Sequence, residues 1–395
     1  MKRVAFTLIF LVSVAMTVAH PWPANPSSTP TVTLLRTPHD GIQPQTSLGF
    51  DGVLHMIYFK GDAGAGDIEY VSRKSGHADF STPIRINSEP ASAIAVGTVR
   101  GPQMALGRNG RVYVVWFGAK PQSVDGTETM PVLFSRLNDS HTAFEPQRNL
   151  LHYTKATDGG ISIAADTRGN VYAVWHAMGA EPGEDHRRVY LARSTDDGKT
   201  FAPEAPISSR TLGACGCCGM RAFADQRGTL FVLYRAATQK IHRDMTLLVS
   251  ADRGDTFREA MLGPWELNAC PMSTAYLSER GKQLLAAWET AGQVYFDSID
   301  PASLKLSSTI SAPGNSDKRK HPAVAAGANG QVLLAWTEGT GWSKGGSLAW
   351  QLFDRAGNPV SAAGQPGAQG QAPGVPVWGL PSVFADPNGN FTIIY

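Results

Sequence analysis

The sequence predicts an all-β protein, a β-propeller of four-stranded antiparallel blades, with seven blades favoured and six blades as the alternative. Three observations predict this fold. A hairpin pattern recurs seven times along the chain, each copy has a tight polar turn that contains glycine, and each copy closes on an aromatic residue. A single hairpin cannot bury both of its faces, so repeated hairpins must stack around a common axis.

Each copy of the repeat is a short apolar strand, a turn, and a second strand of β-branched or aliphatic residues. The copies occupy residues 47–58, 102–116, 161–175, 220–234, 273–288, 322–336 and 381–395. Glycine adopts the positive φ of a hairpin turn without steric cost. The last copy ends on the second strand of its blade, so we expect the segment 31–36 to join that blade and close the ring.

The N-terminus has the layout of a secretory signal peptide. Lys2 and Arg3 precede an apolar stretch over residues 4–18, and small residues follow at a predicted cleavage site after Ala19. We therefore expect a signal peptide over residues 1–19, a flexible leader over 20–30 and one propeller domain over 31–395. The protein should be exported, either to the periplasm or into the medium.

The charge balance argues against polyanionic partners. The chain has 35 basic and 33 acidic residues, and removal of the signal peptide leaves 33 of each. A mature chain with no net charge has no field to attract nucleic acid or an anionic membrane. We expect a monomer without a membrane span after processing, whose ligand is a small molecule, a glycan or a metal ion.

Two segments match the pattern S-x-D-x-G-x-T-[FW]. The matching residues are Ser194, Asp196, Gly198, Thr200 and Phe201 in one blade, and Ser250, Asp252, Gly254, Thr256 and Phe257 in the next. Here the chain resembles the Asp-box (BNR-repeat) sialidase-like β-propeller superfamily. The resemblance implies that each box is a structural hairpin between the third and fourth strands of its blade, so we assign it no catalysis.

All four cysteines lie shortly before the innermost strands of blades four and five. Cys215, Cys217 and Cys218 belong to the segment GACGCCGM, and Cys270 belongs to NACPM. Cys218 precedes its turn glycine by ten residues and Cys270 precedes its own by eleven, so the two occupy equivalent places on neighbouring blades. The propeller symmetry predicts that the two segments lie close together.

Three interpretations of these cysteines are open. In an oxidising compartment Cys270 can form a disulfide with Cys217 or Cys218, which leaves the other two cysteines to pair or to stay free. Alternatively, the thiolates bind a soft metal ion such as Cu(I), helped by a nearby thioether. The thioether candidates are Met220, Met272 and Met245. A redox-active or nucleophilic thiol is the third interpretation. A weaker copper hypothesis uses His20 as the mature N-terminus.

Further ligand candidates lie near the starts of the inner strands, where propellers usually bind their ligands. They are Arg100, Arg221, Lys320 and His321. The resemblance to sialidases implies three arginines that clamp a carboxylate, a Tyr with a Glu partner and an Asp. Arg100, Arg221 and Arg319 are the candidate arginines, but Tyr276 has no obvious Glu partner, and we place Arg85 on an outer strand.

The catalytic set of a sialidase is therefore not found, and we assign no catalytic residue. Binding of a small ligand or a soft metal ion at the axial face is the first hypothesis. An exo-α-sialidase-type glycoside hydrolase and a periplasmic interaction scaffold stabilised by disulfides are the alternatives. The segments His186–Arg188 and His242–Asp244 begin third strands, and we favour solvated strand starts over residues that surround the cysteines.

Overall fold

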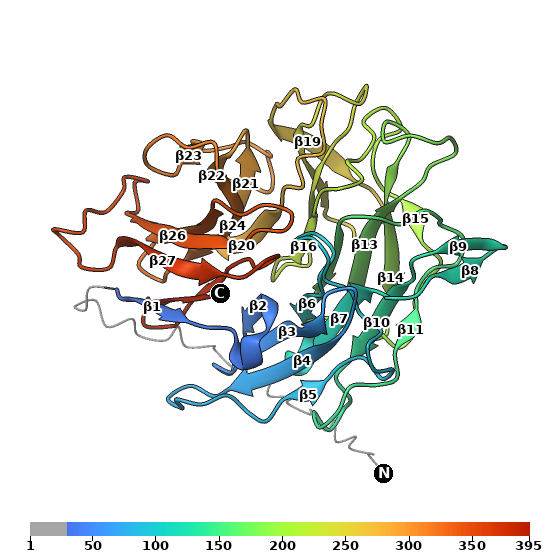
Figure 1. The fold of residues 1–395 in the computed structure, drawn as a ribbon, viewed down its shortest axis with the longest axis horizontal. Helices are drawn as coiled ribbons and strands as arrows, with labels where there is room; N and C mark the ends of the chain where they lie inside the picture. Colours follow the sequence, from blue (N-terminus) through green and yellow to red (C-terminus); the bar gives the residue numbers. More distant parts are fainter. Residues whose placement is uncertain (1–29) are drawn as a thin grey trace, which may run out of the picture.

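The computed structural model describes residues 30–395, and these residues form seven β-sheets arranged in a ring (Figure 1). The predicted all-β propeller is confirmed, and seven blades are present rather than six. The predicted signal peptide, most of the leader and His20 lie outside the described residues. Within residues 30–395 no helix is long and apolar enough to cross a bilayer.

Six blades have four strands each, paired antiparallel in chain order from the axis outwards. Blade one contains β2 (Ile42–Leu48), β3 (Leu54–Asp62), β4 (Ala65–Arg73) and β5 (Ile84–Arg85). Blade two contains β6 (Gln103–Leu106), β7 (Val112–Phe117), β10 (Val132–Arg136) and β11 (Arg148–Asn149). Blade three contains β12 (Ile161–Ala165), β13 (Val171–Ala177), β14 (Arg188–Ser194) and β15 (Ala205–Pro206).

Blade four contains β16 (Arg221–Ala224), β17 (Leu230–Arg235), β18 (Met245–Ser250) and β19 (Arg258–Gly263). Blade five contains β20 (Ala275–Arg280), β21 (Gln283–Thr290), β22 (Gln293–Ile299) and β23 (Ile310–Ser311). Blade six contains β24 (Arg319–Ala326), β25 (Val332–Glu338), β26 (Gly346–Phe353) and β27 (Gln369–Val375). The small hairpin of β8 (Gln122–Val124) and β9 (Thr127–Thr129) and the 3-10 turns η1 (Pro38–Asp40) and η2 (Arg108–Gly110) complete the elements.

The seventh blade joins the two ends of the described chain. It consists of β28 (Ser382–Ala385), β29 (Phe391–Ile394) and β1 (Val32–Leu35), and Figure 1 shows β1 close to the C-terminus. The strand β1 pairs with β29 in parallel, with Val32 opposite Phe391. The predicted closing strand is therefore confirmed. This blade has three strands in the described chain, with β1 in the third position and no described strand outside it.

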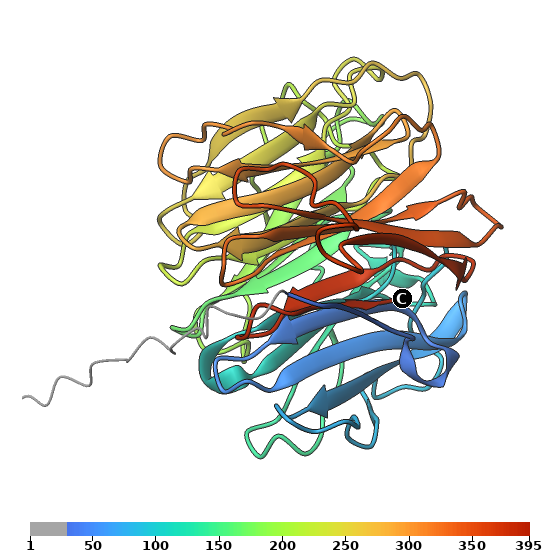
Figure 2. The ribbon, with the colours of Figure 1, turned by 90° about the vertical axis from the view of Figure 1, so that its left-hand side faces the viewer.

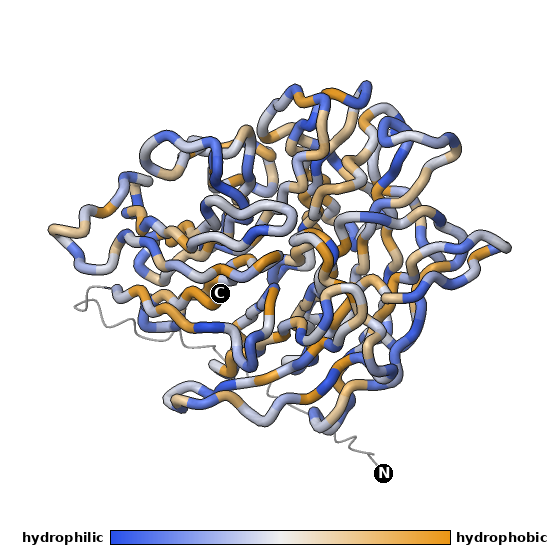
Figure 3. Tube along the Cα trace, in the orientation of Figure 1, coloured by the Kyte–Doolittle hydropathy of each residue, from blue (hydrophilic) through white to orange (hydrophobic). Residues whose placement is uncertain are grey.

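The core lies between the blades. The aromatic residues that close the repeats are buried there: Tyr58, Trp116 and Trp175 are fully buried, and Tyr234 and Trp288 nearly so. In Figure 3 apolar residues follow the strands, whereas many connecting loops are hydrophilic. Figure 2 shows the strands of successive blades stacked side by side across the ring. Burial of these faces is the main favourable contribution to folding.

Both predicted Asp boxes form the expected hairpin between third and fourth strands. In blade three, Asp196 Oδ1 accepts the Thr200 amide at 2.9 Å and the Ser194 hydroxyl at 2.7 Å. Phe201 packs edge-on against Phe134 of blade two, with the ring centroids 4.9 Å apart. The box of blade four repeats these hydrogen bonds through Ser250, Asp252 and Thr256. Each box thus ties its blade to the preceding one, as a structural role requires.

The residue after the box aspartate of blade three is the centre of a buried polar network. Asp197 is 5% exposed and accepts Arg111 Nε at 2.8 Å and the Tyr113 hydroxyl at 2.6 Å, both from blade two. Arg136 donates to its carbonyl at 2.8 Å. A buried carboxylate that binds two arginines links the blades electrostatically. Arg111 also pairs with Asp139 and Arg136 with Glu145, but these two carboxylates are more exposed, so Asp197 is the buried counter-charge of both arginines.

We predict that Asp197→Asn lowers the free energy of unfolding by about 3 kcal/mol, because it removes the buried carboxylate of the network and leaves Arg111 and Arg136 only their more exposed partners. Denaturant unfolding measures the effect. The control is Asp255→Asn, which removes an exposed partner of Arg193 and should cost less than about 1 kcal/mol. Equal losses in the two variants would contradict the account of the network.

Candidate functional site

The cysteines lie on the face of the propeller where the innermost strands begin, which we call the cysteine face. The opposite face, which carries the turns between first and second strands and the Asp boxes, is the hairpin face. Cys215, Cys217 and Cys218 lie in the loop 213–220, which leads from blade three into β16. Cys270 lies in the loop that leads from blade four into β20. Both loops therefore end at the start of an inner strand.

Cys217 and Cys270 form a disulfide, with their Cα atoms 6.2 Å apart. The two segments predicted to be neighbours are thus covalently joined, and the loop 213–220 is tied to the entry of blade five. Cys270 is on the surface and Cys217 is 9% exposed. The bond closes a loop of about fifty residues, for which a stabilisation of about 4 kcal/mol is typical.

Cys215 and Cys218 are free thiols beneath this disulfide. They are 1% and 2% exposed, and the sulfur atoms of Cys215, Cys217 and Cys218 lie within 4.8 Å of one another. Although burial raises the pKa of Cys218, hydrogen bonding from Cys215 and the positive charge of Arg235 outweigh it and lower that pKa. The hydrogen bond with Cys218 and burial raise the pKa of Cys215. Cys215 Sγ also lies 3.6 Å from Cys217 Sγ.

Backbone contacts from two other blades fix the loop. The Cys215 amide donates to the Arg235 carbonyl at 2.9 Å, and the Gly219 amide donates to the Ser273 carbonyl of blade five at 2.9 Å. On the blade-three side, Gly160 approaches so closely that a Cβ atom there would lie 2.6 Å from the Met220 amide nitrogen. A side chain at this position would displace the loop. Three blades therefore determine where the thiols lie.

Arg235 is the buried cation whose positive charge favours the thiolate of Cys218. It is 1% exposed, its Nε donates to Ser273 Oγ at 2.8 Å, and its guanidinium lies 4.8 Å from the ring centre of Trp265. Its other recorded acceptors are the carbonyls of Arg243 and Glu289. It forms no ion pair with a carboxylate in the described part of the chain. Ser273 Oγ also reaches Cys218 Sγ at 3.8 Å.

Two further arginines surround the loop. Arg243 is 4% exposed and pairs with Glu184 at 2.7 Å, and the other Glu184 oxygen accepts the Gly216 amide at 2.8 Å. Arg187 Nε lies 3.5 Å from Nδ1 of His176. Our preference for solvated strand starts is therefore wrong for Arg187 and Arg243. The loops between second and third strands fold over the cysteine face and carry these side chains onto the loop.

His176 is not a free ligand. Its Nε2 accepts the Gly160 amide at 3.0 Å, and burial lowers its pKa to about 3. Among the candidate thioethers, Met272 packs against the cysteines. Met220 packs in the core between blades three and four, and Met245 in the core between blades four and five. The structure thus brings Met272 to the cysteines and uses Met220 and Met245 for packing.

Lys320 and His321 line a small hollow of about 50 Å³ on the cysteine face, together with Met272, Trp342 and Trp378. Both already have partners. Lys320 Nζ donates to the Pro271 carbonyl at 2.8 Å, and His321 Nδ1 lies 3.2 Å from the Thr274 hydroxyl. Burial lowers the pKa of His321 to about 3, which keeps it neutral. They fasten blade six to the loop that carries Cys270.

The three candidate arginines of the sialidase interpretation do not converge. Arg100 pairs with Asp158 at 2.6 Å on the cysteine face. Arg319 pairs with Glu338 at 3.0 Å and donates to backbone carbonyls. Arg221 lies inside the central channel, where burial lowers its pKa. Arg85 lies on the outer strand β5, as predicted. No common anion site forms from these side chains.

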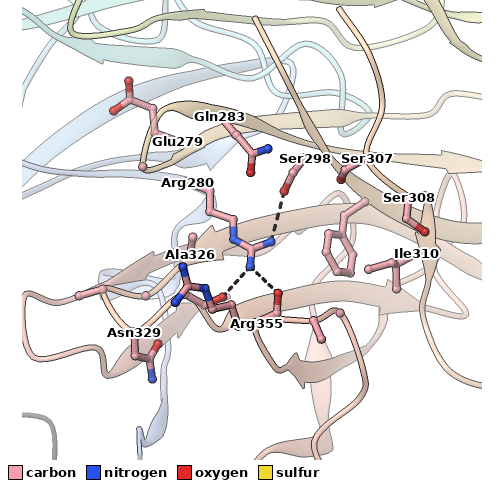
Figure 4. Close-up of a pocket in the computed structure, with 17 residues that line it drawn as sticks. Glu279, Arg280, Gln283, Ser298, Ser307, Ser308, Ile310, Ala326, Asn329 and Arg355 are labelled. Atoms are coloured by element: carbon pink, nitrogen blue, oxygen red, sulfur yellow. Dashed lines mark hydrogen bonds between the residues drawn. The ribbon is translucent and has the colours of Figure 1, made fainter.

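A larger hollow, of about 740 Å³, lies between blades five and six on the hairpin face (Figure 4). Arg280 crosses it and donates to the carbonyls of Gly330 and Arg355 at 2.9 Å each. Ser298 lies at its edge, 3.4 Å from Arg280. The interactions of Arg280 join neighbouring blades where blade six has a short turn in place of a full Asp box. The cysteines lie at the other face.

No protein-family model and no curated protein match the chain. Solved structures do match. A protein of unknown function from Dyadobacter fermentans aligns with a TM-score of 0.53 and 14% identity, over 78% of this chain and 93% of that one. The sialidase of Trypanosoma rangeli aligns with a TM-score of 0.51 and 13% identity, over 77% of this chain and 54% of that one. The chain therefore has the sialidase-like β-propeller fold.

The residues that sequence reasoning missed are Arg235, Ser273 and Glu184. Arg235 directly follows the closing aromatic Tyr234, so it lies at the end of a second strand that returns to the cysteine face. The alternating direction of the strands in the repeat could alone have placed Arg235 at the cysteine face. Ser273 lies two residues before β20, as Gly219 lies two residues before β16. Glu184 lies in an irregular loop, and no periodicity in the sequence fixes its position.

We predict two thiols per chain in denaturant and close to none in the native protein, when the protein is prepared without reductant. The two free cysteines are buried and the other two form the disulfide, so a thiol reagent reaches Cys215 and Cys218 only after unfolding. A colorimetric thiol assay measures both values. Zero or four thiols in denaturant would contradict this assignment.

Proposed function

We propose that this chain is an exported sialidase-like propeller that binds one soft monovalent metal ion, best matched by Cu(I), through Cys215 and Cys218. The observation that carries the proposal is the pair of buried thiols beside Arg235, a buried cation that forms no ion pair with a carboxylate at contact distance among residues 30–395. Export rests on the signal-peptide pattern of residues 1–19.

The donor set selects the metal. Thiolates prefer soft ions such as Cu(I) over hard ions such as Mg²⁺ or Ca²⁺. Two metal–sulfur bonds of about 2.3 Å span at most about 4.6 Å. The sulfur atoms of Cys215 and Cys218 lie within 4.8 Å of each other, so one ion can bridge them after a small adjustment. Two thiolates and one monovalent cation carry a net charge of −1, which Arg235 can balance.

Zn²⁺ fits this site less well. Structural zinc sites use four protein ligands in a tetrahedron. With Cys217 and Cys270 in a disulfide, only two thiolates are available, and His176 already accepts a backbone hydrogen bond. The disulfide instead holds the loop 213–220 against blade five and so pre-positions the two free thiols. Met272, which packs on the cluster, is the available additional soft donor.

The alternatives receive less support. A sialidase needs several arginines around one carboxylate, whereas Arg100 and Arg319 are occupied by acidic partners on separate parts of the fold. Likeness of fold does not carry catalysis. An interaction scaffold stabilised by disulfides requires the covalent link but gives no role to the two buried free thiols. We therefore place metal binding first.

Titration with Cu(I) under anaerobic conditions, in competition with a chromogenic chelator, tests the proposal. We expect one Cu(I) per chain, and at least a 100-fold loss of affinity in Cys215→Ser and in Cys218→Ser, because one thiolate cannot bridge the ion. Met261→Leu is the control, since it removes a sulfur that is 59% exposed and remote from the cluster.

Two outcomes would overturn the proposal. One is that Cu(I) does not bind to protein whose two thiols are verified as reduced, or that it binds with an affinity that the serine substitutions do not weaken. The other is an equal loss of affinity in Met261→Leu. Hydrolysis of a fluorogenic sialoside by the wild-type protein would favour the glycoside hydrolase alternative instead.

A further inference from the structure

The central channel of the propeller contains a cavity that is separate from the cysteine cluster. The cavity has a volume of about 410 Å³, and the innermost strands of all seven blades line it. It shares Leu48, Leu106 and Phe223 with a second hollow of about 460 Å³, which is lined by turns of the hairpin face. The two hollows form one funnel that opens on the hairpin face.

Arg221 lies in this channel as part of a polar layer. Its Nη1 donates to Gln103 Oε1 of blade two at 2.6 Å and to Gln45 Oε1 of blade one. Its guanidinium carbon lies 4.7 Å from the ring centre of Tyr276 on blade five. A side chain from blade four therefore reaches across the channel to three other blades.

Within the described chain, one edge of the Arg221 guanidinium is free. No carboxylate forms an ion pair with it in residues 30–395, and its recorded hydrogen bonds use Nη1 only. Nε and Nη2, which form the other edge of the guanidinium, have no hydrogen-bond partner there. An arginine in a protein interior is normally paired, because an unpaired buried charge is costly. The free edge presents two parallel N–H donors, the arrangement that binds two oxygens of one anion.

We propose that the channel binds the carboxylate of a small organic monoanion on the Nε and Nη2 edge of Arg221. The lining residues Met104, Ala164, Ala222 and Ala325 offer an apolar wall to the organic part of such a ligand. The site is separate from the cysteine cluster, and it is entered from the opposite face.

The acidic rim of the funnel repels anions, and it repels those that carry several negative charges most strongly. Its titratable lining residues are acidic: Asp51, Asp166, Asp225 and Glu279. Arginine and lysine are absent from that lining. In the inner cavity Arg221 is the one basic lining residue, and Glu279 is the one acidic lining residue. An acidic rim repels phosphate dianions more strongly than monocarboxylates, since Coulomb repulsion scales with the product of the charges. One guanidinium can also neutralise only one negative charge.

Binding of butyrate, compared with its neutral analogue butyramide, tests this inference. Isothermal titration at constant ionic strength, repeated with inorganic phosphate, should detect butyrate and give at least tenfold weaker binding for butyramide and phosphate. We expect Arg221→Gln to weaken butyrate binding at least tenfold. Arg355→Gln is the matched control, because it removes a positive charge from the hollow between blades five and six and should leave binding unchanged.

A second variant covers the case in which Arg221→Gln does not fold. Ala224 lines both hollows, so Ala224→Leu should narrow the funnel and weaken butyrate binding at least tenfold while Arg221 is retained. Equal binding of butyrate and butyramide by the wild-type protein would overturn the inference, as would full butyrate binding in both channel variants. Tighter binding of phosphate than of butyrate would overturn the choice of a monocarboxylate. None of these results depends on copper binding.

Discussion

The structure depends on one constraint: each blade must bury its faces against the two adjacent blades. This requirement stacks the hairpins around an axis, and it brings the starts of all innermost strands to one face. Two segments that are 53 residues apart thereby come within the reach of a single disulfide between Cys217 and Cys270. Buried aromatics pack between neighbouring blades, and the Asp197 network ties blade three to blade two.

Two arginines of the described chain, Arg235 and Arg221, form no contact ion pair with a carboxylate. Arg235 lies beneath the cysteine face, where neighbouring thiols can supply negative charge once they are ionised. Arg221 lies in the channel, where the protein offers only amide oxygens and an aromatic ring. Other interior arginines, including Arg111, Arg136 and Arg243, have carboxylate partners. Arg235 and Arg221 therefore differ from these arginines, and each is available to a negatively charged partner.

The repeat in the sequence was sufficient to predict the blades, the closing strand and the proximity of the cysteine segments, because these follow from strand period and register. It was not sufficient for the residues around the cysteines. Arg187 and Arg243 come from loops between second and third strands, whose conformation depends on tertiary contacts such as the Arg243–Glu184 pair. Lys320 and His321 were placed on the correct face, but the pattern could not reveal that local partners occupy them.

The central claim, that radial stacking places Cys217 and Cys270 in covalent reach while Cys215 and Cys218 stay reduced, is tested most directly by peptide mapping. Trypsin cleavage after arginine yields the peptides 211–221 and 259–280. After alkylation without reduction, mass spectrometry should find these two peptides joined by one disulfide, with alkyl groups on Cys215 and Cys218. A peptide 211–221 with an internal disulfide, together with an alkylated Cys270, would contradict the account.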